Sequence, residues 1–212
     1  MMGKSLAELA NEQEVLLGST DRERNGYFSG FYENAFSKYR DLDIKLLEIG
    51  SAYGGGLMAW HDWFSQAEIY GAELRDHTPG GKVLREKNEP EFIWYNEVFL
   101  PDLSKYPRMK SHNGYNAYTR EFADSLPMMD IIIDDAWHSV DQWELLYELY
   151  LDKVNPGGIM VIEDIPANGS LPVNARSGWN IKELIEPIKH LDHEVITIVN
   201  HAGPVNLLVI RF

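Results

Sequence analysis

The sequence predicts a three-layer, doubly wound α/β fold in which helices cover both faces of a mostly parallel sheet. Apolar runs at residues 46–49, 129–135 and 159–162 have the length of buried strands. Segments with helical periodicity separate these runs, and that alternation is typical of parallel strands. Two final runs, residues 195–199 and 205–212, are joined by Asn-His-Ala-Gly-Pro, which predicts a C-terminal antiparallel β-hairpin.

Composition limits the classes of protein and partner to be considered. The 212 residues carry a formal net charge of -14, which argues against an extended contact with nucleic acid or an anionic membrane. Cysteine is absent, so disulfides, zinc–thiolate sites and cysteine nucleophiles are excluded. No apolar run approaches the roughly 20 residues of a membrane span, and the N-terminal segment is too acidic for a secretory signal. We therefore expect a cytoplasmic protein; its oligomeric state stays open, with a homo-oligomer among the alternatives.

A single domain covering residues 1–212 is expected, because no linker, repeat or low-complexity tract divides the chain. Residues 5–17 and 27–39 show helical periodicity and precede the first strand. Residues 1–43 are therefore predicted to form a helical cap on an α/β core of residues 44–212. The second helix carries an aromatic stripe, which we assign to core packing rather than to a substrate pocket. Its members are Phe28, Phe31, Tyr32 and Phe36.

The stretch at residues 45–60, KLLEIGSAYGGGLMAW, combines a strand, a glycine-rich turn and the start of a helix. This arrangement brings backbone close to a nucleotide-like ligand at the carboxyl end of a strand. Ala52 stands where a dinucleotide-binding turn needs its second glycine, and the lysine of a phosphate-binding loop is absent. Glu48, shortly before the turn, would repel a pyrophosphate but suits a cationic ligand. These features favour S-adenosylmethionine (SAM), which carries a sulfonium and an ammonium.

A second strand is expected at residues 69–74, with Glu73 at its carboxyl end. An acid about 20 residues beyond a glycine turn can accept hydrogen bonds from both ribose hydroxyls. A solvated acid at a strand end is the alternative interpretation. The following segment has little pattern; an extra strand is expected at residues 92–98. The next strand of the sheet is placed at residues 115–118 and a short helix at residues 119–126.

Two predicted strands end in pairs of carboxylates, Asp134 with Asp135 and Glu163 with Asp164. Carboxyl ends of parallel strands meet at one sheet edge, so Asp135, Glu163 and Asp164 are expected to converge. Crowded acids need a positive partner, and an oxygen-only ligand set suits magnesium, calcium or manganese. The alternative is that one acid of each pair caps a helix while the other faces water.

Ser139 and Gln142 form a capping-box pattern, in which each side chain would bond a backbone N–H at the start of a helix. The Asn-Pro-Gly-Gly sequence at residues 155–158 is expected to stop this helix. A later helix is expected at residues 180–190, where Pro187 would shorten or kink it.

His138 lies three residues beyond Asp135, at the mouth of the predicted acidic site. A histidine beside a cation and an open pocket is a candidate general base, because the ordinary pKa of histidine is close to neutral. An incidental loop histidine is the alternative. Trp137 either walls the pocket or fills an interface. A loop at residues 166–178, rich in Pro, Gly, Asn and Ser, is a candidate substrate loop.

Several motifs recur in the order and spacing of known families. Between residues 20 and 165 they are Thr-Asp-Arg, Tyr32, LLEIGSAYGGGLMAW, WFSQAEIYGAEL, IDDAWH and VNPGGIMVIED. The last two are similar to the I-D-D-G-S-H and P-G-G-x-x-x-x-E-D signatures of macrolide sugar O-methyltransferases. The chain also resembles the related cephalosporin-hydroxylase and rhamnosyl O-methyltransferase families.

This resemblance implies a Rossmann-like methyltransferase fold that binds SAM, and an activity that depends on Mg2+. The metal acids of the family fall on Asp135, Glu163 and Asp164, and its general base falls on His138. Its cofactor residues fall on the glycine turn and on neighbouring strand ends. We expect cofactor contacts from Glu48, Gly50, Ser51, Tyr53, Gly54, Glu73, Asn116 and Asp134.

The chain departs from the family pattern at three points. Ala136 and Trp137 replace a Gly-Ser pair, which is expected to narrow the pocket. Residue 25 or 26 stands where the family has a histidine. Residues 114–116, Gly-Tyr-Asn, correspond to a G-D-Q motif that touches adenine, with its acid lost. These departures bear on the substrate and the adenine contacts more than on the type of reaction.

We therefore predict an O-methyltransferase that moves the SAM methyl group to a hydroxyl of a small molecule, a sugar or a glycosylated metabolite. Mg2+ held by Asp135, Glu163 and Asp164 would acidify the hydroxyl, and His138 would take its proton. The alternative, motivated by Trp137, is a non-catalytic SAM-binding or accessory protein with the same fold. The glycine pattern disfavours an NAD-dependent oxidoreductase, and the net charge disfavours a nucleic-acid methyltransferase.

Overall fold

The computed structural model describes most of the predicted core. The described residues are 4–17, 22, 26–52, 54–74, 82–84, 97–99, 105–167, 181–200 and 203–212. The predicted cofactor residue Tyr53 lies outside them, as do most of the predicted substrate loop and most of the predicted strand at residues 92–98.

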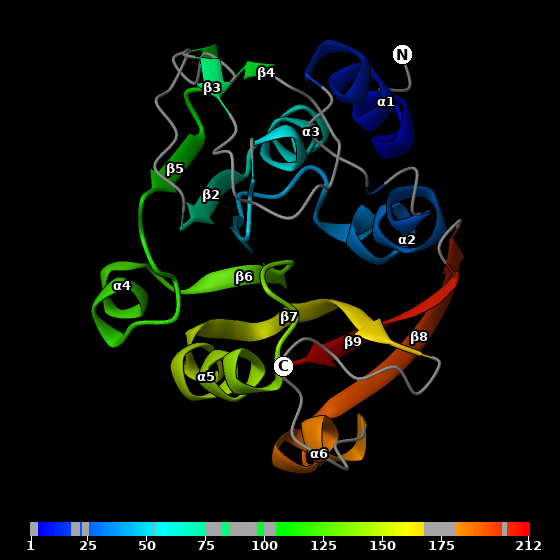
Figure 1. Ribbon diagram of the computed structural model, residues 1–212, viewed down its shortest axis with the longest axis vertical. Coiled ribbons are helices and arrows are strands. Elements are labelled where there is room, and N and C mark those ends of the chain that lie inside the picture. Colours follow the sequence, from blue (N-terminus) through cyan, green and yellow to red (C-terminus); the bar gives the residue numbers. More distant parts are fainter. Residues whose placement is uncertain are drawn as a thin grey trace.

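A seven-stranded sheet runs through the middle of the molecule in the order β5-β2-β1-β6-β7-β9-β8 (Figure 1). Its strands are β1 (Lys45–Ile49), β2 (Glu68–Glu73), β5 (Met109–Asn113), β6 (Met129–Asp134), β7 (Val154–Pro166), β8 (Asp192–Asn200) and β9 (Gly203–Arg211). Strands β5, β2, β1, β6 and β7 pair in parallel, whereas β9 is antiparallel to β7 and to β8. A separate antiparallel pair is formed by β3 (Lys82–Leu84) and β4 (Glu97–Phe99). The predicted parallel sheet with its C-terminal hairpin is confirmed.

Helices cover both faces of this sheet (Figure 1). One face carries α1 (Leu6–Leu17), α3 (Gly55–Trp63) and a helical segment made of a π-helix (Phe28–Tyr32), α2 (Glu33–Phe36) and a 3-10 turn (Ser37–Tyr39). The other face carries α4 (Arg120–Ser125), α5 (Val140–Tyr150) and α6 (Ile181–Ile185). Alternate residues of each central strand point into one of the two cores, as Leu46 and Leu47 of β1 do. No helix among the described residues combines the length and apolar character needed to cross a membrane.

The aromatic stripe before the first strand packs in the core, as predicted. The rings of Phe28 and Tyr32 meet Trp60 of α3 edge to face, at centroid distances of 4.9 and 5.3 Å. Leu6 and Phe36 are buried in the same cluster as the strands. The N-terminal helices therefore share the core of the α3 layer; their predicted role as a cap over the cofactor stays a prediction.

The strand predicted at residues 115–118 is wrong, because the strand beside β2 is β5, at Met109–Asn113. Its sequence, MKSHN, lacks an apolar run because β5 is an edge strand with mostly half-buried side chains. Residues 115–118 instead form the approach to α4, where Asn116 Oδ1 accepts a hydrogen bond from the Tyr118 backbone N–H at 2.9 Å. The helix predicted next is confirmed as α4, with Thr119 accepting a bond from the Phe122 N–H as its N-cap.

Two details around α5 also differ from expectation. Ser139 is the N-cap residue of α5, but its hydroxyl donates to Gln142 Oε1 at 3.0 Å instead of accepting from a backbone N–H. The helix ends at Tyr150, before the Asn-Pro-Gly-Gly sequence, which lies within β7. Asn155 is held there because its Nδ2 donates to Asp130 Oδ1 at 2.8 Å. As expected, Pro187 shortens the later helix: α6 ends at Ile185 and a 3-10 turn (Glu186–Ile188) contains the proline.

Candidate functional site

The glycine turn and the first acid pair are held together by backbone contacts at the carboxyl edge of the sheet. The Gly50 N–H donates to the Ala72 carbonyl at 2.9 Å, and the Asp135 N–H donates to the Ile49 carbonyl at 2.9 Å. Gly50 has a φ of 86°, and a Cβ at this residue would lie 2.2 Å from the Asp135 carbonyl oxygen. Only glycine fits this position, because both the backbone conformation and the space exclude a side chain.

Replacing Gly50 with alanine is therefore expected to destabilise the protein by at least about 3 kcal/mol, from left-handed strain and backbone overlap together. Two glycines provide matched controls in the same thermal or urea unfolding measurement. Gly157→Ala tests the strain alone, since its φ is 82° and no described atom lies within 4 Å of its Cβ position. It should cost roughly 1–2 kcal/mol. Gly30→Ala, with normal φ and open space, should be neutral or stabilising. Equal losses for Gly50→Ala and Gly157→Ala would contradict the close approach to Asp135.

The remaining residues of the turn lead into α3. Ser51 is buried, and its carbonyl accepts a hydrogen bond from the Gly54 N–H at 2.8 Å. Gly54 is the residue before α3 and has a φ of 84°, while Ala52 has a φ of 44°. The turn thus presents backbone N–H groups at the N-terminus of α3, next to the carboxyl end of β1.

The predicted ribose and adenine residues lie on one side of this turn. Glu73 is buried at the end of β2, and its carbonyl accepts from the Tyr115 N–H at 3.1 Å. That bond places the exposed Asn116 in the loop beside Glu73. The roles of both residues in binding a nucleoside stay predictions.

Asp134, also predicted to contact the cofactor, is 2% exposed. Tyr118 Oη donates to its Oδ1 at 2.6 Å. Burial raises the pKa of Asp134 to about 6, although the hydrogen bonds from Tyr118 and from the Ala136 N–H lower it. The structure therefore gives this carboxyl group protein partners; cofactor contact stays a prediction.

Asp135, His138 and Asp164 converge at the same edge. His138 Nε2 lies 3.8 Å from Asp135 Oδ1 and 3.6 Å from Asp164 Oδ2. One donor atom from each of the three residues lies within 4.8 Å of the others. His138 and Asp164 also have left-handed backbones, with φ of 50° and 56°. Such strain persists where the surrounding structure enforces it, and it is concentrated at functional sites.

Arg22 is the main functional candidate that the sequence reasoning missed. Its side chain is only 3% exposed and reaches three carboxylates. The three contacts are Nε to Glu163 Oε1 at 2.9 Å, Nη1 to Glu48 Oε2 at 3.1 Å and Nη2 to Asp135 Oδ2 at 2.6 Å. Burial disfavours the charged guanidinium, yet these acids raise the pKa of Arg22 well above its usual value. Part of the positive charge that the acids require is thus supplied by the chain itself.

Two tyrosines bind the second acid pair. Tyr32 Oη donates to Glu163 Oε1, and Tyr27 Oη donates to Asp164 Oδ1. Glu163 is completely buried, and burial raises its pKa to about 7 despite the neighbouring Arg22. Its second oxygen, Oε2, has no hydrogen-bond partner among the described residues. A buried carboxylate oxygen in this position is suited to a cation.

Glu48 is also buried, at 1% exposure, and is held by Trp60 as well as Arg22. Trp60 Nε1 donates to Glu48 Oε2 at 2.6 Å. The carboxylate therefore lies beneath the glycine turn, against α3. Its predicted contact with a cationic part of the cofactor stays a prediction.

The residues present fit a divalent cation. Asp135 and Asp164 supply carboxylate oxygens and His138 supplies a nitrogen, and one such atom from each lies within 4.8 Å of the others. Glu163 is not part of this group; its Oε1 is held by Arg22 and Tyr32, and its role as a metal ligand stays a prediction. Arg22 contacts three carboxylates, those of Glu48, Asp135 and Glu163, which leaves an excess of negative charge even before Asp164 is counted. The hard oxygen donors suit Mg2+ better than a soft metal.

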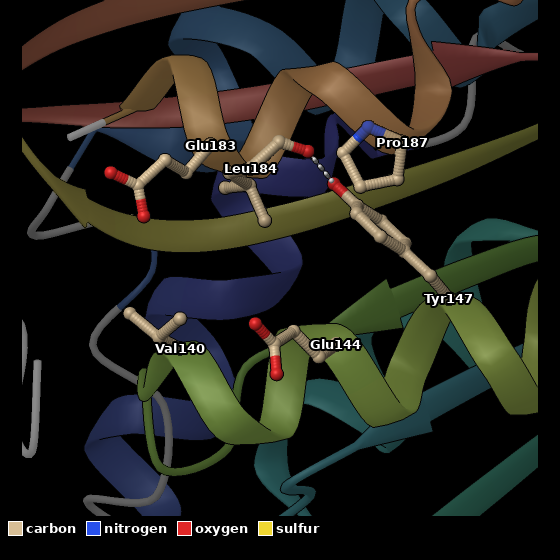
Figure 2. A pocket seen from close by; sticks show the side chains of 6 residues that line it. All are labelled: Val140, Glu144, Tyr147, Glu183, Leu184 and Pro187. Carbon is tan, nitrogen blue, oxygen red and sulfur yellow. Dashed lines mark hydrogen bonds between the residues drawn. The ribbon is translucent and has the colours of Figure 1, made fainter. Parts of the chain in front are cut away.

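The segment that follows Asp135 includes an exposed tryptophan. Trp137, between the acid and the histidine, is 59% exposed, so it does not fill an interface within the described part of the chain. Beyond His138, Val140 begins a groove between α5 and α6 (Figure 2). Its lining includes Leu184 and Pro187, and Tyr147 Oη crosses it to donate to the Leu184 carbonyl at 3.0 Å.

Sequence comparison finds curated O-methyltransferases that are similar to this chain. No protein-family model matches the chain. The 8-demethyl-8-alpha-L-rhamnosyl tetracenomycin-C 2'-O-methyltransferase of Streptomyces olivaceus is 24% identical over 180 residues, 78% of this chain and 42% of that protein. The demethylmacrocin O-methyltransferase of Streptomyces fradiae is 25% identical over 151 residues, 66% of this chain and 32% of that protein. The chain thus spans less than half the length of these curated relatives.

Solved structures agree on the fold. The MycE methyltransferase of mycinamycin biosynthesis, in complex with Mg, SAH and mycinamycin VI, has a TM-score of 0.61 at 21% identity. The match covers 99% of this chain and 54% of that one. Aeropyrum pernix fibrillarin with bound S-adenosyl-L-methionine has a TM-score of 0.54 at 12% identity, covering 81% and 68%. The chain is thus similar in sequence to curated O-methyltransferases and in fold to a solved methyltransferase.

Proposed function

We propose that this protein is a Mg2+-assisted O-methyltransferase that uses SAM to methylate a hydroxyl group of a glycosylated small molecule. The observation that carries the proposal is the convergence of Asp135, His138 and Asp164 beside the glycine turn. The curated relatives are named for methyl transfer to rhamnosyl-tetracenomycin and to demethylmacrocin, which supports this acceptor class.

The cofactor would lie across the carboxyl ends of β1 and β2. The backbone from Gly50 to Gly54 would approach its methionine part, and Glu73 would accept hydrogen bonds from the ribose hydroxyls. Asn116, in the loop beside Glu73, would contact the adenine. This arrangement would direct the methyl group toward the acids at the ends of β6 and β7.

The metal would be held by Asp135, Glu163 and Asp164, and when bound it would lower the pKa of the acceptor hydroxyl. His138 Nε2, which faces both aspartates, would take the hydroxyl proton. SAM, when bound, would supply the methyl group, with S-adenosylhomocysteine as the leaving group. The products are a methyl ether, S-adenosylhomocysteine and a proton on His138.

The acceptor would enter beside Trp137. An exposed indole at the mouth of a site offers an apolar face against which a sugar ring can pack. Because Trp137 directly precedes His138 in the chain, a ring packed against it would lie near the proposed base. Trp137 is thus assigned to acceptor binding.

The direct test is an incubation of the protein with SAM, Mg2+ and glycosylated macrolides or anthracycline-like acceptors that carry sugar hydroxyls. We expect an O-methylated product by mass spectrometry, loss of turnover with EDTA and recovery with Mg2+. Calorimetry should show SAM binding without the metal. SAM binding with no transfer to any acceptor at saturating Mg2+ would instead favour the non-catalytic alternative.

A further inference from the structure

Arg22 contacts one oxygen of each of two carboxylates that are proposed to bind the metal. Its Nη2 contacts Asp135 Oδ2 at 2.6 Å, and its Nε contacts Glu163 Oε1 at 2.9 Å. The opposite oxygens have other surroundings. Asp135 Oδ1 faces His138 Nε2 at 3.8 Å, and Glu163 Oε2 is buried without a hydrogen-bond partner in the described structure. One oxygen of each carboxylate is therefore engaged by the guanidinium.

The space for the guanidinium is built into the first turn of α3. A Cβ at Gly56 would lie 2.4 Å from Arg22 Nη1 and 2.8 Å from Glu48 Oε1. The absence of a side chain at Gly56 therefore leaves room for the guanidinium of Arg22. Glu48, which accepts a hydrogen bond from Trp60, contacts the third guanidinium nitrogen, Nη1. A rigid three-point contact of this kind needs the planar fork of arginine.

Divalent cations differ in whether they bind a carboxylate through one oxygen or through both. Ca2+ accepts about 6–8 oxygen ligands and commonly binds a carboxylate through both oxygens. Mg2+ requires near-octahedral geometry, with ligands at about 2.1 Å, and takes one oxygen from each carboxylate. Arg22 contacts Asp135 Oδ2, and Arg22 together with Tyr32 contacts Glu163 Oε1, so a cation bound through both oxygens of either carboxylate would compete with these hydrogen bonds.

We propose that Arg22 is a positioning residue that makes Asp135 and Glu163 monodentate and so gives the site its preference for Mg2+ over Ca2+. This inference rests on the metal-binding part of the proposed function. It concerns the binding of cations rather than turnover, so the two can fail separately.

The test measures the dissociation constants of Mg2+ and Ca2+ by calorimetry on the whole chain, without acceptor. The wild-type protein should bind Mg2+ more tightly. In Arg22→Lys the charge is kept but the three-point contact is lost, and the ratio of the Ca2+ to the Mg2+ dissociation constant should fall about tenfold. A purely structural role would lower the unfolding temperature and leave this ratio unchanged.

Gly56→Ala is the second variant, in case Arg22→Lys does not fold. The added Cβ displaces the end of Arg22 without removing any charge, so the ratio should fall in the same direction. If a folded variant keeps the wild-type ratio of the two dissociation constants, this inference is wrong but the proposed function is unaffected. A wild-type protein that prefers Ca2+ also overturns it, and one that binds neither cation removes the metal part of the proposed function as well.

Discussion

Replacing His138 with glutamine is expected to lower kcat for methyl transfer by about 10²–10⁴-fold, the range that a general base contributes. Glutamine keeps a polar side chain of similar reach but cannot accept the proton. SAM affinity should stay unchanged, because the His138 ring faces Asp135 and Asp164. The measurement is steady-state turnover at saturating SAM and Mg2+, together with calorimetry of SAM binding.

The same variant separates two roles for His138. Its Nε2 lies near enough to both aspartates to act as a metal ligand instead of a base. If His138 is the base, the variant should lose turnover with little change in its affinity for Mg2+. If His138 is a metal ligand, the variant should bind Mg2+ tenfold or more weakly. The exposed His190→Gln serves as the control for removing a histidine elsewhere in the chain. Near-normal turnover of His138→Gln would exclude the role of general base.

The central part of the fold was predictable because buried parallel strands require continuous apolar sequence. The run of isoleucines in β6 is an example, and its acids had to follow where the strand leaves the core. The edge strand β5 has no such requirement. Its backbone pairs with β2, while its side chains are free to be polar, so the sequence MKSHN carried no strand signal.

The candidate site was predictable only where it lies at strand ends. Asp135, Glu163 and Asp164 follow apolar runs, so their convergence follows from the topology. Arg22 belongs to no strand, and it reaches Glu163 across 141 residues of sequence. The Thr-Asp-Arg motif was the signal available for it.

Tyr27 and Tyr32 were hidden in the aromatic stripe. The spacing of the stripe predicts its burial but does not distinguish the two tyrosine hydroxyl groups. A buried tyrosine hydroxyl needs a polar partner, which distinguishes these two residues from the phenylalanines beside them. Asking for that partner would have pointed to the acid pair at the end of β7.

Asp164→Asn is expected to reduce both Mg2+ affinity and kcat, by roughly 10²-fold or more, because the charge and one metal-binding oxygen are lost. Asparagine is well suited to isolate this effect. It tolerates the left-handed backbone at residue 164, and its Oδ1 can still accept from Tyr27. Stability should therefore change little. Asp152→Asn, an exposed acid in the turn after α5, is the matched control and should behave as the wild type.

The measurements are Mg2+ calorimetry, turnover over a range of Mg2+ concentrations and SAM calorimetry. If Asp164 holds the metal, excess Mg2+ should restore part of the lost turnover, and SAM affinity should be unaffected. If Asp164 only orients His138, kcat should fall at every Mg2+ concentration while Mg2+ affinity stays that of the wild type. That second result would assign the metal to other acids, because Asp164 Oδ2 lies 3.6 Å from His138 Nε2 and can act on it directly.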